Sequence, residues 1–169
     1  FLVKTVNPIV VSDGTDRMNL YIDLDQSHET GWEGYDYVIN RARSETHADI
    51  EKFSNNSWEA EKIGEAEYVL GSDYMVLKLD KRDLGLMSGE IINFDFKWSD
   101  HSTTDGNVME FMDLGDTAPN DRFNFRYLAR SEGGSGLSTT AVIAIIVCAA
   151  ALILTVSVII IFKRVGKNG

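Results

Sequence analysis

Three short stretches of the sequence concentrate the side chains that are suited to binding a sugar. They are residues 31–41 (GWEGYDYVINR), 96–100 (FKWSD) and 113–125 (DLGDTAPNDRFNF). Sugars present apolar C–H faces that stack on flat rings, and their hydroxyls need planar hydrogen-bonding partners. Because each stretch combines aromatic rings with Asp, Asn or Arg, the three together predict a carbohydrate-binding site.

The predicted ligand-binding surface draws on all three stretches. Its members are Trp32, Tyr35, Asp36, Asn40, Arg41, Trp98, Asp113, Asp116 and Arg122. Trp32 lies between two glycines, so stacking on a sugar and packing inside the protein are equally open to it. Trp98 continues the apolar side of a strand and favours the core. Asp36 and Asn40 alternate with Tyr35 and Arg41, so a bulge or a strand end must turn one pair toward the ligand.

Acidic side chains predict a weaker second site, for calcium. Asp23 and Asp25 share one face of a strand, and Glu29 and Glu33 follow in the next loop. Carboxylate oxygens are the ligands that calcium prefers, although the spacing is not that of an EF-hand loop. A solvated acidic face is the competing interpretation. On a surface this acidic, Arg41, Arg122 and Arg126 are most often partners of nearby carboxylates.

Catalytic patterns are missing from the sequence. It has no nucleophile elbow, P-loop, HExxH or nucleophilic cysteine pattern, and His28, His47 and His101 lack metal-ligand spacing. We therefore expect a module that is not an enzyme. The alternative is a glycoside hydrolase or esterase that uses an inconspicuous pair of carboxylates.

Period-two alternation indicates that strands position these residues. The alternating segments are residues 20–25, 74–79, 91–98 and 122–128, and further strands are expected at 1–6, 35–40, 48–53, 58–63 and 66–70. Residues 83–87 are expected to form one helical turn. Short strands separated by turn residues predict an all-β fold, namely an antiparallel β-sandwich covering residues 1–130.

The C-terminal part predicts attachment to a membrane. Residues 141–162 are 22 apolar or small residues without a charge, Pro or Gly, long enough for a single transmembrane α-helix. Residues 131–140 are a Gly/Ser/Thr-rich linker, and residues 163–169 are a basic tail that favours the cytoplasm. We therefore expect a single-pass type I protein of the cell membrane, with residues 1–140 outside the cytoplasm. Phe1 is then expected to follow upstream sequence of a longer precursor.

The net charge and the cysteine content exclude nucleic acid as a partner and a disulfide within the chain. The formal net charge of −10 leaves no basic footprint for nucleic acid, and a single cysteine, Cys148, excludes an internal disulfide.

The sequence resembles the family 9-like carbohydrate-binding modules of the DOMON-like β-sandwich superfamily, which have a jelly-roll architecture. The resemblance lies in residues 20–25 with 31–41, in 94–100 and in 112–127, and it extends over about residues 1–128. It implies sugar binding without catalysis, within a larger surface protein that acts on polysaccharide, and it implies that opening strands lie upstream of Phe1. The alternative is a purely structural or protein-interaction module, which burial of both Trp32 and Trp98 would favour.

Overall fold

The computed structural model describes residues 1–9, 18–87, 91–100 and 105–129. They belong to a compact unit that spans Phe1–Ser131 and is separate from Glu132–Gly169. The predicted linker at 131–140, membrane span at 141–162 and tail at 163–169 lie outside the described residues. Within the described ranges, no helix has the length and apolar character needed to cross a bilayer.

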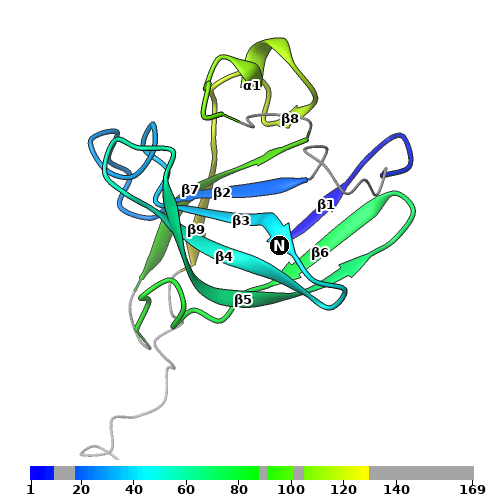
Figure 1. The fold of residues 1–169 in the computed structure, drawn as a ribbon, viewed down its shortest axis with the longest axis horizontal. Helices are drawn as coiled ribbons and strands as arrows, with labels where there is room; N and C mark the ends of the chain where they lie inside the picture. Colours follow the sequence, from blue (N-terminus) through cyan, green and yellow to red (C-terminus); the bar gives the residue numbers. More distant parts are fainter. Residues whose placement is uncertain (10–17, 88–90, 101–104, 130–169) are drawn as a thin grey trace, which may run out of the picture. The chain divides into compact units, whose positions relative to one another are not determined.

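One antiparallel sheet of nine strands forms the described part, and it curls into a half-barrel (Figure 1). The hydrogen-bonded order is β1-β6-β5-β4-β3-β2-β7-β8, and β9 also pairs with β7. The elements are β1 (Leu2–Lys4), β2 (Asn19–Asp23), β3 (Tyr37–Arg43), β4 (His47–Phe53), β5 (Ala60–Leu70), β6 (Tyr74–Lys78), β7 (Ile92–Ser99), the short helix α1 (Glu110–Asp113), β8 (Thr117–Ala118) and β9 (Phe125–Ala129).

The prediction of an antiparallel all-β fold is confirmed, and the described strands are hydrogen-bonded into one sheet. The strands predicted at 58–63 and 66–70 are a single strand, β5. A register shift opposite Ile50 and Glu51 lets β5 keep pairing with β4 through Gly64. The helical turn expected at 83–87 is replaced by hydrogen-bonded turns that begin slightly earlier, in which Leu84 N and Gly85 N donate to the carbonyls of Lys81 and Arg82. The short helix of the described residues is α1, in the segment between β7 and β8.

Each face of the sheet has its own hydrophobic core. The core inside the curl, called here the inner core, combines strand residues such as Leu20, Ile39, Met75 and Phe94. The core on the opposite face, called the outer core, is mostly aromatic and contains Tyr21, Trp32, Tyr35, Val38, Phe53 and Phe111. Strand β2 is buried over all five residues because both of its faces are covered.

Loops cover the outer core. Tyr21 and Val38 come from neighbouring positions in β2 and β3. Trp32 and Tyr35 come from the β2–β3 connection, and Phe111 comes from α1. Of the predicted sugar-binding stretches, residues 31–41 therefore supply Trp32, Tyr35 and Val38 to this core, whereas Trp98 belongs to the inner core.

Candidate functional site

Trp32 is buried at the centre of the outer core. Its side chain is 5% exposed, and its indole Nε1 donates a hydrogen bond to the Gly106 carbonyl at 3.2 Å. Trp58 packs edge-on against it with ring centroids 4.5 Å apart. Further ring contacts come from Tyr21, Tyr35, Phe53 and Phe111. A ring surrounded in this way has no free face for a sugar, so the packing alternative describes Trp32.

A tight loop with two glycines places Trp32 in this core. Trp32 and Tyr35 exchange backbone hydrogen bonds of 2.9 and 2.8 Å. Gly31 has a φ of +60°, and a Cβ there would lie 1.8 Å from the Tyr35 carbonyl oxygen. Because no side chain fits that space, Gly31 is required for the turn that folds the loop back onto the sheet.

Two predicted residues, Tyr35 and Arg122, join the β2–β3 loop to the loop before β9. The buried Tyr35 hydroxyl donates a hydrogen bond to Asn124 Oδ1 at 2.7 Å. Arg122 Nη2 pairs with Glu33 Oε2 at 3.0 Å on the surface. Burial raises the pKa of Tyr35 above its usual value, so this hydroxyl stays a donor. The sequence stretches at 31–41 and 113–125 are thus in contact.

The bulge that the alternation argument required is present in β3, but it turns Asn40 away from the outer face. The β3–β4 register shifts between Ile39 and Arg43, and Asn40 has a φ of +80°. Its side chain is fully buried, and Nδ2 donates to the Met18 carbonyl at 2.9 Å. The prediction that Asn40 shares a ligand surface with Trp32 is therefore wrong, because the two side chains belong to opposite faces.

Arg41 lies on the outer face and serves a structural contact. Its guanidinium binds both carboxylate oxygens of Glu51, at 3.1 and 2.8 Å. It also lies 4.9 Å from the centre of a Trp58 ring and donates to the Trp58 carbonyl. Arg41 thus holds Trp58 against the outer core, as a partner of a nearby carboxylate.

The other predicted residues do not gather around Trp32. Trp98 is 3% exposed and belongs to the inner core, as its position in the strand favoured. Asp113 ends α1 and Asp116 precedes β8, and both are exposed. The backbone carbonyl of Asp116 accepts a hydrogen bond from Asp100 N at 2.8 Å, which places it near the end of β7.

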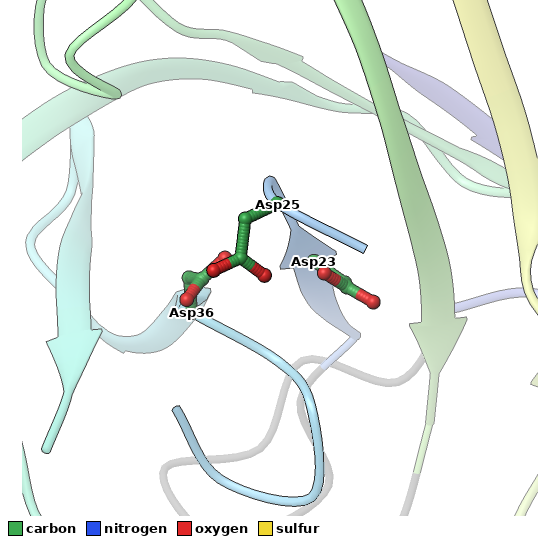
Figure 2. A group of neighbouring side chains, drawn as sticks. All are labelled: Asp23, Asp25 and Asp36. Atoms are coloured by element: carbon green, nitrogen blue, oxygen red, sulfur yellow. The ribbon is translucent and has the colours of Figure 1, made fainter. Parts of the chain in front are cut away.

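Three carboxylates converge at the end of β2 (Figure 2). Ligand oxygens of Asp23, Asp25 and Asp36 all lie within 4.8 Å of one another. Burial, together with the neighbouring carboxylates, raises the pKa of Asp23 to about 6. Burial also raises the pKa of Asp36. The sequence had singled out Asp23 and Asp25, but it had assigned Asp36 to a sugar.

Asp36 joins the other two because β2 and β3 form a hairpin. Ile22 pairs with Tyr37, so the residues that follow β2 and precede β3 are neighbours. Each carboxylate also accepts a backbone N–H: Gln26 N to Asp23 at 2.6 Å, Ser27 N to Asp25 at 2.9 Å, and Leu24 N to Asp36 at 2.8 Å. The cluster therefore fixes the turn after β2, and its oxygens suit a hard cation such as calcium.

Sequence reasoning missed the buried Lys97. Its Nζ donates to the carbonyls of Pro119 at 2.5 Å and Phe123 at 3.0 Å, and it lies 5.3 Å from the centre of the Phe111 ring. Burial lowers the pKa of Lys97 to about 8. In the sequence, Lys97 alternates with Phe96 and Trp98, and nothing local shows that a distant loop covers its side of the strand.

The chain matches no protein-family model, and neither a curated protein nor a solved structure matches it.

Proposed function

We propose that residues 1–130 form a non-catalytic structural or protein-interaction module of a membrane-anchored surface protein. One observation carries this choice over sugar binding at Trp32: Trp32 and Trp98 are 5% and 3% exposed. A stacking platform must be accessible before the ligand arrives, and neither indole meets that condition.

The polar residues of the outer face support the same proposal. The side chains of Tyr35, Arg41 and Arg122 are engaged with Asn124, Glu51 and Glu33. A sugar bound through them would have to break contacts that hold the loops together. These contacts are the ones expected of residues that hold covering loops against a core.

A titration of polysaccharides and oligosaccharides against residues 1–131 tests the proposal. We expect no binding that depends on Trp32. The comparison uses Trp32→Phe, which keeps an aromatic ring in the core, and Trp58→Phe as a matched control. Sugar binding that is lost in Trp32→Phe, with an unchanged melting temperature, would overturn the proposal. Hydrolysis of chromogenic glycosides or esters that one Asp or Glu substitution abolishes would overturn its non-catalytic part.

Carbohydrate binding of the family 9-like kind is the second candidate, with a different residue at its centre. Phe123 is 73% exposed and follows Arg122 in the loop that meets the β2–β3 loop. An exposed flat ring next to an arginine has the chemistry that a sugar face needs. A glycan array with Phe123→Ala and the control Leu128→Ala, whose side chain is 55% exposed, separates this candidate from the first. Binding lost only in Phe123→Ala would favour sugar recognition.

Calcium binding at Asp23, Asp25 and Asp36 is proposed as a stabilising feature of the module. The oxygens fit the metal's preference for carboxylates, and a cation would offset the repulsion that adds to burial in raising the pKa of Asp23. We expect millimolar calcium to raise the melting temperature of the wild type but not that of Asp25→Asn. Asp113→Asn, at an exposed position on α1, is the matched control. An equal effect of calcium on both variants would place the cation elsewhere.

We further propose that residues 141–162 are the membrane anchor and that residues 1–140 lie outside the cytoplasm. The module is proposed to be a jelly-roll sandwich. Protease treatment of intact cells is expected to remove the acidic module and to leave residues 163–169 protected. Cleavage of the tail with protection of the module would reverse the topology.

A further inference from the structure

The inner face of the sheet holds an apolar groove. It has a volume of about 660 Å³ and lies between the end strands of the curled sheet. Its walls include Phe1, Leu77, Leu84, Phe94, Phe96 and Tyr127. A groove of this volume is within the range of roughly 300–1,000 Å³ that is typical of small-ligand sites.

The wall at β9 is apolar and open. Tyr127 and Phe125 are each 46% exposed, although their rings pack on Phe94 and Phe96 with centroids 5.3 and 5.6 Å apart. Phe1 contacts the same two rings of β7 from the opposite end of the sheet. The rings that line the groove therefore contact one another: Tyr127 is 46% exposed, Phe1 and Phe96 are half-buried, and Phe94 is buried beneath them.

Both charged side chains that line this groove are basic. They are Lys78 and Lys81, in a chain whose formal net charge is −10. Lys78 pairs with Glu67 at 3.0 Å, whereas Lys81 forms no ion pair with any described residue. Because Lys81 lines this apolar groove, the groove is complementary to a molecule with an apolar body and an anionic head.

We propose that this groove binds a single-chain anionic amphiphile of the long-chain carboxylate class. The hydrocarbon chain lies along the rings of Phe96 and Tyr127, and the carboxylate pairs with Lys81. This site goes beyond the proposed function, because it uses the opposite face of the sheet and no residue of the outer core.

Chain length gives the first test, since each buried CH2 group strengthens binding about fourfold until the groove is full. Residues 1–131 are a compact unit with two cores of their own, so they serve as the protein. Displacement of a fluorescent fatty acid by C8, C10, C12 and C14 carboxylates, each below its micelle concentration, should show this gain. Equal affinity for every chain length would overturn the proposal.

The head group gives the second test. At equal chain length we expect the carboxylate to bind at least tenfold more tightly than the alcohol or the trimethylammonium compound. Lys81→Glu should remove this preference, and Lys62→Glu on β5, outside the groove, should keep it. A preference that survives Lys81→Glu, or binding of the cationic compound alone, would contradict the site.

The groove wall gives the third test. Tyr127→Asp should abolish binding, whereas Leu128→Asp, one residue along β9 and not in the groove wall, should not. If Tyr127→Asp lowers the melting temperature, the wild type is used instead. Addition of the C12 carboxylate should then shift the aromatic proton resonances of Phe94 and Tyr127. The absence of such shifts in the wild type would overturn the proposal.

Displacement of the probe by an alternating apolar peptide but not by any carboxylate would assign the groove to a protein strand instead.

Discussion

The two faces of the sheet differ in how they are closed. Strand residues such as Leu20, Ile39 and Met75 supply the inner core, which leaves a groove of about 660 Å³. The outer core takes Trp32, Tyr35 and Phe111 from loops and α1, and these rings cover one another. Trp32 and Tyr35, which the sequence predicted on a ligand-binding surface, are therefore buried in the outer core. An open apolar groove lies on the other face.

The two faces also differ in what their lysines contact. Lys97 reaches from β7 into the outer face and holds two carbonyls of the loop before β9. Lys81 lines the groove of the inner face and forms no ion pair with a described residue. The buried Lys97 fixes the backbone of a loop, whereas the ammonium group of Lys81 is available to a ligand.

Removing the central ring of the outer core should have the largest effect on stability. Trp32→Ala deletes the contacts with Tyr21, Tyr35, Phe53, Trp58 and Phe111, and we expect a loss of about 3–5 kcal/mol in the free energy of unfolding. Urea denaturation followed by circular dichroism measures it. Tyr127→Ala on the open inner face, where the ring is 46% exposed, should cost less. A loss for Trp32→Ala no larger than that for Tyr127→Ala would break the contrast between the faces.

The pH dependence of stability sharpens the comparison through Lys97. Its pKa is about 8 in the folded protein and 10.5 for an unperturbed lysine, so between these pH values the unfolded chain binds more protons. Stability should therefore rise as pH increases from about 8 to about 10.5, by a few kcal/mol at most, as the cost of the buried charge disappears. Thermal unfolding of Lys97→Met, compared with wild type over this range, isolates the contribution of Lys97. The same pH profile in both proteins would contradict it.

The hydrogen bond between the two loops should have the smallest effect of the three. Tyr35→Phe removes the hydroxyl that donates to Asn124 and keeps the ring in the outer core. We expect a loss of about 1 kcal/mol, because a typical hydrogen bond contributes about that much. Arg122→Gln, which removes an exposed ion pair with Glu33, is the matched comparison and should cost less. A larger loss for Arg122→Gln would reverse the order.

The inner face could be predicted from the sequence, because strand register alone builds it. Alternation in residues 20–25 and 91–98 identified Leu20, Ile22, Phe94 and Trp98 as one apolar set, and all four are in the inner core. The strand break between 58–63 and 66–70 was wrong because pairing with β4 continues through Gly64.

The outer face could be predicted only in part. The stretches at 31–41 and 113–125 were expected to meet, and they are in contact through Tyr35 and Asn124. The burial of Trp32 depends on the φ of Gly31 and on rings from distant segments, and the inward turn of Asn40 depends on a bulge. Such features arise from tertiary packing, so a local pattern does not carry them.

Acrylamide quenching of Trp32 fluorescence tests the central claim most directly, namely that the predicted platform is part of a core. The double variant Trp58→Phe/Trp98→Phe leaves Trp32 as the single tryptophan, and its circular dichroism must match the wild type. With an exposed fraction of 5%, Trp32 should be quenched several times less efficiently than in the same chain unfolded in urea. Quenching as efficient as in the unfolded chain would show an open ring and would return Trp32 to the ligand-binding surface.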